Sequence, residues 1–225
     1  MPTEVTTPPA SITTDGTVQT LFITTTPGVY VLELDAALLG AGETIQISAT
    51  AKVRAAGAAL NVWSPVTLTG ALAEPNILTR TMAVVAPQGV TFTIQRTAGA
   101  DHAYPYRVDR IAACTVIAEN SLVFTNNVEQ IVTASVVNGT FVLLTDHSGQ
   151  GAGDTVVLRL RVVAASGGTL RVVEMVTLAG VQADASGLAR QQSVAEPSDY
   201  SMSAGLTQTA GANPTVPWAL CQVGN

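Results

Sequence analysis

The sequence predicts an all-β protein made of two tandem antiparallel β-sandwich domains, of immunoglobulin-like or jelly-roll topology. Residues 60–70 and 170–180 are two copies of the same predicted strand. In both copies apolar side chains occupy alternate positions, which is the period of a half-buried strand. Turn signals recur about every 8 to 12 residues with no helical period between them. A chain of 225 residues also suits two domains of roughly 100 to 120 residues each.

The duplication continues on both sides of this strand. The turn at residues 40–44 matches residues 151–155, with an acidic residue followed by Thr in both copies. The segments 97–101 and 209–213 also match. Because matched positions are 110 to 112 residues apart, small loop insertions must separate otherwise fixed strands. Further matched pairs are Leu78 with Leu188, Arg80 with Arg190, Pro87 with Pro197, Pro105 with Pro217, and Tyr106 with Trp218.

The elements are expected in the following order. Residues 1–16, rich in Thr and Pro, predict a flexible N-terminal arm, because this composition does not form a packed element. Residues 17–112 form the first sandwich, residues 113–122 a linker, and residues 123–225 the second sandwich. Alternating apolar residues place inward-facing strands at Tyr30, Leu32 and Leu34, at Ile45, Ile47 and Ala49, and at Val90, Phe92 and Ile94, with second-repeat counterparts that include Val156, Leu158, Met202 and Leu206.

Composition and charge exclude several classes of function. The net charge of −6 opposes sustained binding to a phosphate backbone, so we expect no nucleic acid partner. The first residues carry neither the basic nor the apolar region of a secretory signal. No apolar run reaches the roughly 18 residues of a membrane span. We therefore expect a protein made in the cytoplasm, with no membrane partner.

Candidate catalytic and metal-binding residues are few and scattered. His102 and His147 occupy different places in the two repeats, and we expect both to be exposed loop residues rather than parts of a triad or zinc site. The acidic residues lack the oxygen-rich spacing of a calcium loop and are interpreted as turn-forming or solubilising. We predict no catalytic, cofactor-binding or metal-binding residue, no cofactor and no enzymatic activity. The acidic residues considered are Glu33, Asp35, Glu43, Asp146 and Asp154.

The two cysteines, Cys114 and Cys221, fall outside the repeat correspondence, since Cys221 matches Asp109. We interpret them as buried, unreactive thiols, with an interdomain disulfide as the alternative.

Three arginines, Arg159, Arg161 and Arg171, have no basic counterpart in the first repeat. A solvated strand face is the simpler interpretation, and a contact surface for an acidic partner is the alternative. Trp63, Tyr106 and Trp218 are expected to pack in cores, although they are the residues from which a sugar-stacking platform would be made.

The repeated pattern resembles small β-sandwich virion proteins of tailed bacteriophages. The pattern consists of Gly-x-aromatic-Val-Leu, Gly-Ala-Gly-acidic-Thr, a long Leu/Val strand that ends in Gly, then Thr-Ala-Gly-Ala and Pro-aromatic. The resemblance implies a non-enzymatic capsid decoration or cement protein that bridges major capsid protein subunits on the outer surface of the virion. It also implies self-association there and assembly in the host bacterial cytoplasm. A carbohydrate-binding or host-adhesion module on the head or tail is the alternative.

Overall fold

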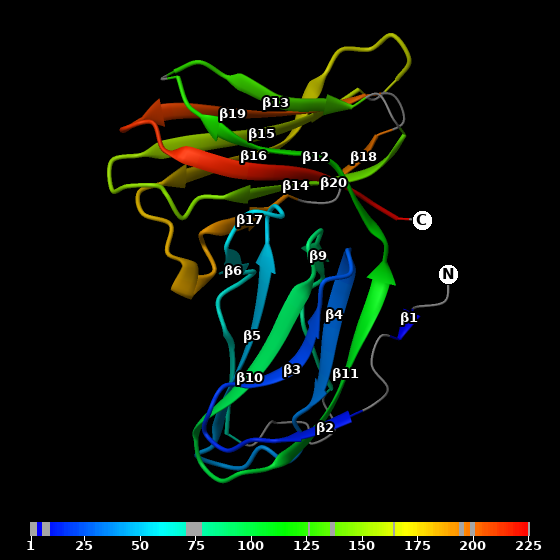
Figure 1. The fold of residues 1–225 in the computed structure, drawn as a ribbon, viewed down its shortest axis with the longest axis vertical. Helices are drawn as coiled ribbons and strands as arrows, with labels where there is room; N and C mark the ends of the chain where they lie inside the picture. The colour runs from blue at the N-terminus through cyan, green and yellow to red at the C-terminus, as the bar shows by residue number, and fades with distance from the viewer. Residues whose placement is uncertain are drawn as a thin grey trace.

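The computed structural model describes residues 4–5, 10–70, 78–125, 127–135, 138–163, 165–193, 196–198 and 201–224. Its strands form four antiparallel sheets, grouped in two sandwiches (Figure 1). The sandwiches are stacked so that the strands of the second run across the end of the first. In the described part of the chain the only helical element is the single 3-10 turn η1 (Asp184–Ser186). The predicted all-β fold with two tandem sandwiches is confirmed.

The first sandwich contains sheet A, with strand order β1-β11-β4-β8, where β2 also pairs with β11 and β9 with β4. Its second layer is sheet B, with order β3-β10-β5-β6, where β7 also pairs with β5. The strands are β1 (Glu4–Val5), β2 (Ala10–Thr13), β3 (Gln19–Thr24), β4 (Gly28–Asp35), β5 (Thr44–Lys52), β6 (Ala59–Asn61), β7 (Val66–Thr69), β8 (Leu78–Arg80), β9 (Val84–Ala86), β10 (Val90–Ala98) and β11 (Ala103–Ala112).

The second sandwich repeats this plan. Sheet C has the order β12-β20-β14-β17, with β18 also on β14, and sheet D has the order β13-β19-β15-β16. The strands are β12 (Cys114–Val123), β13 (Gln130–Ser135), β14 (Gly139–Asp146), β15 (Thr155–Val162), β16 (Arg171–Ala179), β17 (Arg190–Gln192), β18 (Glu196–Ser198), β19 (Met202–Ala210) and β20 (Thr215–Val223).

The predicted linker at residues 113–122 is wrong, because this stretch is strand β12 and only Ala113 separates it from β11. The prediction of a flexible arm at residues 1–16 is wrong for its described part, since β1 and β2 pair with β11. Strands β2 and β12 occupy equivalent places in the two repeats. Ser11 of β2 lies opposite Pro105, and Ser121 of β12 lies opposite Pro217, which is the counterpart of Pro105 in the second repeat. The two segments are therefore the first strand of each sandwich. The Thr-rich segment of the first repeat has no apolar stripe, so its sequence does not predict a strand. Only its backbone pairing with β11 identifies it as one.

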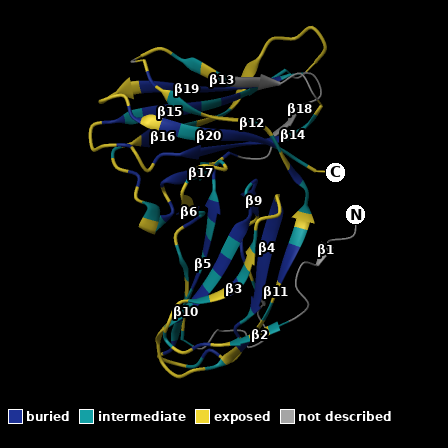
Figure 2. Ribbon diagram, in the orientation of Figure 1, coloured by how far each residue is buried: buried dark blue, intermediate teal, exposed yellow. Residues whose placement is uncertain are grey.

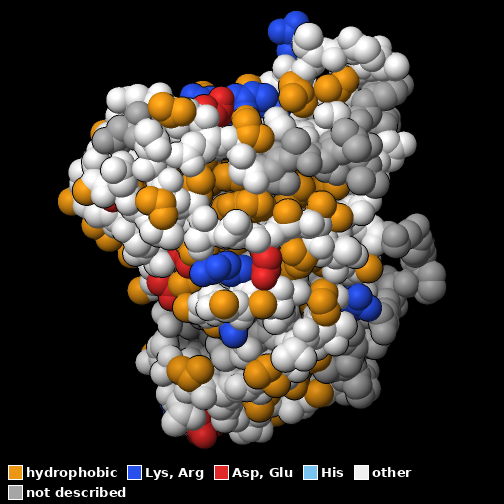
Figure 3. Space-filling view, turned by 45° about the horizontal axis from the view of Figure 1, so that its top comes forward, with side chains coloured by type: hydrophobic (Ala, Val, Ile, Leu, Met, Phe, Trp, Pro, Cys, Tyr) orange, Lys and Arg blue, Asp and Glu red, His pale blue; other side chains and the backbone are white. Residues whose placement is uncertain are grey.

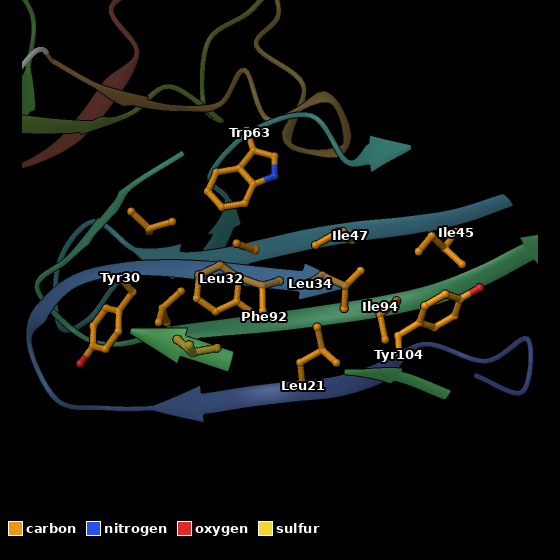
Figure 4. Close-up of a cluster of buried hydrophobic side chains, with 14 of the residues drawn as sticks. Leu21, Tyr30, Leu32, Leu34, Ile45, Ile47, Trp63, Phe92, Ile94 and Tyr104 are labelled. Carbon is orange, nitrogen blue, oxygen red and sulfur yellow. The ribbon is translucent and has the colours of Figure 1, made fainter. Parts of the chain in front are cut away.

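Each sandwich has its own core, drawn from the inner faces of its two sheets. In the first, the alternating residues of β4, β5 and β10 meet as predicted, and Phe92 is fully buried. Figure 4 shows this cluster, with Trp63 at its edge beside the chain of the second sandwich. In the second, Leu158, Leu206 and Trp218 occupy the equivalent layer. The period-2 pattern therefore identified the inward residues correctly, since one face of each strand is buried.

The duplicated strand does not have the same structure in its two copies. Residues 171–179 form the single strand β16, whereas the first copy is divided into β6 and β7 by a loop at residues 62–65. Pro65 lies in this loop, where its missing N–H costs no ladder hydrogen bond. Trp63 turns back from the loop into the first core, with its ring centroid 6.2 Å from that of Phe92. The prediction of one continuous strand holds only for the second copy.

A third apolar cluster joins the two sandwiches. Val29 and Val85 from the end of the first sandwich pack on Val142 and Leu144, which point outward from sheet C. Burial of each Val or Leu side chain contributes about 1.5–3 kcal/mol, so this cluster favours one fixed arrangement. Figure 2 shows the buried colour continuing across the junction. The remaining buried members of the cluster are Val53, Cys114, Ala219 and Cys221.

Divergence between the repeats explains why only one sheet is covered. Leu144 pairs with Ala219 in sheet C, and the corresponding pair in sheet A is Glu33 with Arg107. Arg107 forms an ion pair with Glu33 at 2.6 Å, and the Glu33 carboxylate is also 3.6 Å from Arg80. The outward face of sheet C, which the first sandwich covers, is therefore apolar. The equivalent face of sheet A, which no sandwich covers, is charged.

Polar contacts fix the loop of residues 62–65 on η1. The backbone N–H of Asn61 donates to the Asp184 carboxylate at 2.7 Å, and the Asn61 amide donates to the Asp184 carbonyl at 3.0 Å. The Ser64 hydroxyl donates to the Ser186 carbonyl. Gly187 follows η1 with φ +73°, and a Cβ there would overlap the backbone of Trp63 and Ser64. The close approach of the two chain segments therefore requires glycine at this position.

We expect Gly187→Ala to loosen the junction. Gly167→Ala is a matched control, because Gly167 has φ +72° but a Cβ added there would have no atom within 4 Å. Both changes add backbone strain of about 1 kcal/mol or more, and Gly187→Ala adds about 1–3 kcal/mol of overpacking. Urea denaturation, followed by circular dichroism, measures both. Equal destabilisation by the two variants would contradict the tight contact.

Candidate functional site

Both histidines lie in loops as predicted, but His147 is buried and His102 is only partly exposed. His147 is fully buried, with its Nε2 2.8 Å from the Thr145 hydroxyl. His102 is partly exposed, and its Nε2 lies 2.8 Å from the Glu43 carboxylate. Nothing in the local sequence signals the burial of His147, because it depends on the backbone hydrogen bond from His147 to the Ala189 carbonyl.

The acidic residues of the matched turns have a structural role, as expected. Glu43 accepts a hydrogen bond from the Gly40 N–H at 2.5 Å, and Asp154 accepts one from the Gly151 N–H at 2.7 Å. The hydrogen bond from Gly40, followed by that with His102, lowers the pKa of Glu43. Within the described ranges, no group of three or more His, Cys, Asp or Glu side chains is placed to hold a metal ion. The acidic residues thus close turns.

The cysteines are buried and unpaired, which confirms the predicted free thiols. Cys114 lies on β12 and Cys221 on β20, so both belong to the second sandwich and the alternative of an interdomain disulfide is wrong. The neighbouring Cys114 thiol, together with burial, raises the pKa of Cys221. Their place in the junction explains why Cys221 has no cysteine counterpart in the first repeat.

The three aromatic residues do not form an exposed platform. Trp63 and Trp218 are only 8% and 6% exposed, and both belong to cores. Tyr106 packs against the first core, and its hydroxyl donates to the Leu21 carbonyl at 2.8 Å. The expectation of packed aromatic side chains is confirmed.

Arg159 and Arg161 point outward from sheet D, but they do not form an uncompensated basic patch. Both approach Glu129, at 3.6 Å from Arg159 and 2.7 Å from Arg161. Arg159 also donates to the Thr207 hydroxyl at 3.0 Å. Figure 3 shows basic and acidic side chains side by side on the upper part of the molecule, with hydrophobic ones beside them. The alternative of a surface for an acidic partner therefore loses its main support.

The edge of sheet D carries an exposed apolar stretch on β16 and the residue before it. Strand β16 pairs with β15 alone among the described strands, so its other side presents unpaired backbone groups. We call the stretch formed by Leu170, Val172, Val173 and Met175 the β16 edge; these side chains are 41%, 49%, 43% and 62% exposed. In the first sandwich the matching edge is broken by the loop of residues 62–65 and fixed on η1. The sequence pattern identified this strand but not its exposure.

A hollow lies at the junction between the two sandwiches. It has a volume of about 350 Å³, and Val62, Trp63 and Met82 of the first sandwich and Leu188 and Arg190 of the second are among its lining residues. Arg190 is only 2% exposed and donates from Nη2 to the Val85 carbonyl, while the Val85 N–H donates to Gln192 at 3.1 Å. Burial lowers the pKa of Arg190 to about 10.

Sequence matching missed the special position of Arg190. It aligned Arg190 with Arg80, but Arg80 lies opposite Glu33 in sheet A, and Arg190 lies opposite Asp146 in sheet C. In register, Arg80 corresponds to Gln192, opposite Leu144. Arg80 is exposed and ion-paired, whereas Arg190 is inside the junction. No local signal distinguishes the two arginines, because the difference comes from the docked sandwich.

The buried His147 should make stability fall in mild acid. Burial lowers its pKa from 6.5 to about 4, although the nearby Gln150 and Asp146 oppose the shift. Below pH 6.5 the unfolded chain therefore binds a proton that the folded chain does not. Between this pH and about pH 4, the loss of unfolding free energy grows to the order of 3 kcal/mol.

Urea midpoints at pH 7 and pH 4.5 test this for the natural protein, for His147→Gln and for His102→Gln. We expect His147→Gln to flatten the pH dependence and His102→Gln to retain it. An unchanged slope in His147→Gln would contradict the assignment.

Comparisons with known proteins give distant likenesses. No family model matches the chain, and no curated protein matches it. The chain is similar to the crystal structure of the PBSX exported protein XepA, with 9% identity and a TM-score of 0.32, over 99% of this chain and 86% of that one. It is also similar to the tandem CBM22-1–CBM22-2 domains of Xyn10C from Paenibacillus barcinonensis, with 8% identity and a TM-score of 0.25, over 92% and 82% of the two chains.

Within the described residues no helix has the length and hydropathy to cross a membrane. The fold class therefore rests on the strands and sheets described above.

Proposed function

We propose that this chain is a non-enzymatic structural protein of a phage virion, and that it decorates the outer capsid surface and stabilises neighbouring major capsid protein subunits. The observation that carries the proposal is the exposed β16 edge. A long apolar edge strand is a template for association, and soluble proteins usually interrupt, charge or cover it. The first copy of this strand is interrupted by a loop. The second is one continuous strand, in which Arg171 and Glu174 stand among the exposed apolar residues and the register against β15 shifts between Leu160 and Arg161.

The junction between the sandwiches supports the same role. A protein that bridges capsid subunits must transmit load between its contact points, which a rigid pair of domains does better than two domains on a linker. The apolar cluster around Val85, Val142 and Leu144 provides that rigidity. The sequence resemblance to β-sandwich virion proteins of tailed phages supplies the partner. Assembly takes place in the host cytoplasm, and copies of the chain associate side by side on the shell.

The alternative, a carbohydrate-binding or host-adhesion module, depends on exposed aromatic side chains. Since Trp63 and Trp218 fill cores and the Tyr106 hydroxyl is hydrogen-bonded, no observation favours it.

Quantitative mass spectrometry of purified virus particles tests the role directly by giving copies of this chain per copy of major capsid protein. A ratio typical of a decoration lattice supports the proposal. A handful of copies would move the protein to the tail or a vertex, and absence from particles would overturn the proposal.

Charge on the β16 edge should weaken capsid binding. We expect the double variant Val172→Lys, Met175→Lys to bind capsids that lack this protein roughly tenfold or more weakly, because lysine blocks edge pairing. Ile23→Lys is the control, since Ile23 is 69% exposed but lies on β3 of the first sandwich. Sedimentation of capsids with bound protein measures the affinity. Equal binding by the two variants would remove β16 from the contact surface.

A further inference from the structure

Two residues that line the hollow at the junction carry hydrogen-bond donors that no protein atom accepts. The Nε and Nη1 atoms of Arg190 are buried and have no hydrogen-bond partner, and neither has the Nε1 atom of Trp63. Both side chains line the hollow, and they are 98% and 92% buried. Buried polar groups almost always find a partner, and a buried charge without one is costly. These three nitrogens therefore indicate a missing acceptor.

The charge of the missing group follows from the surroundings of Arg190. Among the described residues, no carboxylate forms an ion pair with it. Asp146 lies opposite in the strand register, but its carboxylate accepts from the N–H and hydroxyl of Ser148, at 2.9 and 2.6 Å. Every unsatisfied atom of Arg190 and Trp63 is an N–H donor. The Arg190 side chain also carries a positive charge. An anionic acceptor complements this set best.

The walls of the hollow determine the rest of the ligand. Val62, Met82 and Leu188 are apolar, and Met82 and Leu188 are 71% and 50% exposed at its surface. A volume of about 350 Å³ accommodates a group of one or two amino-acid residues in size. The donor nitrogens are buried, so a ligand can reach them only after side chains of the lining move.

We propose that the junction between the sandwiches binds a carboxylate that carries a small apolar group, with the carboxylate on Arg190 and Trp63 and the apolar group against Val62 and Leu188. This chemistry is shared by a free branched-chain acid and by the C-terminal residue of a polypeptide that ends in an apolar side chain. The site takes one wall from each sandwich, so its ligand also holds the sandwiches together. The proposal does not depend on the role in the virion.

The chain offers an internal reporter for the test. It contains two tryptophans, Trp63 at the site and Trp218 in the second core, so its nitrogen-15 NMR spectrum has two indole N–H signals, assigned with Trp63→Phe. The probes are 3-methylbutanoate, a hexapeptide ending in leucine with a free carboxylate, and the same hexapeptide as its C-terminal amide. We expect an acid probe to move the Trp63 signal, with a Kd on the order of 1 mM or below, and to leave the Trp218 signal in place.

The two acid probes distinguish the sources. Similar affinities assign the site to a free small acid, and roughly tenfold tighter binding of the peptide assigns it to a polypeptide C-terminus. The amide should not bind, because it lacks the charge. No movement of the Trp63 signal with either acid at about 10 mM, or equal binding of the amide, would overturn the proposal.

Variants test the placement of the ligand. Arg190→Gln removes the charge but also changes the junction, so Met82→Glu provides a second test at an exposed position. The added carboxylate repels the ligand, and we expect affinity to fall by roughly tenfold. Ile23→Glu, on the first sandwich at a comparably exposed position, should leave affinity unchanged. Unaltered binding in Met82→Glu would move the ligand elsewhere.

Discussion

The structure depends above all on the covering of sheet C by the end of the first sandwich. Val142 and Leu144 point out of their own sandwich and would meet water without the partner domain. The hydrophobic effect makes that exposure unfavourable, so the two sandwiches behave as one body with three cores. The interruption of the duplicated strand, the requirement for glycine at position 187 and the burial of Arg190 all follow from the closeness of this contact.

The same ancestral strand consequently serves two purposes. In the first repeat it is divided into β6 and β7, and the loop between them meets η1 across the junction. In the second repeat it remains the continuous strand β16, with one side unpaired among the described strands. Duplication thus supplied one copy for internal docking and left the other with an exposed edge. Both the proposed capsid contact and the proposed carboxylate site arise from this division.

Local patterns predicted much of the fold and little of the junction. The alternation at Val90, Phe92 and Ile94 identified core residues correctly, because half-buried strands reveal themselves within a few positions. The sequence predicts a linker at β12, and the structure shows a strand there with more exposed residues than buried ones. The burial of His147 and of Arg190 depends on chain segments far away in sequence, and no short-range pattern encodes it. The hollow lies where such distant segments meet, so the sequence predicted neither the hollow nor the donors on its lining residues.

The charged outer face of sheet A has a consequence for the evolution of the chain. Glu33, Arg107 and Arg80 occupy the face that, in the other repeat, receives a neighbouring module. A third module placed before the first would have to bury these ions, at a desolvation cost of several kcal/mol per ion. Sheet A therefore acts like the polar cap of a repeat protein, which ends an array by offering no apolar face for further stacking. Docking of a further module on sheet A by the same mode is therefore unfavourable.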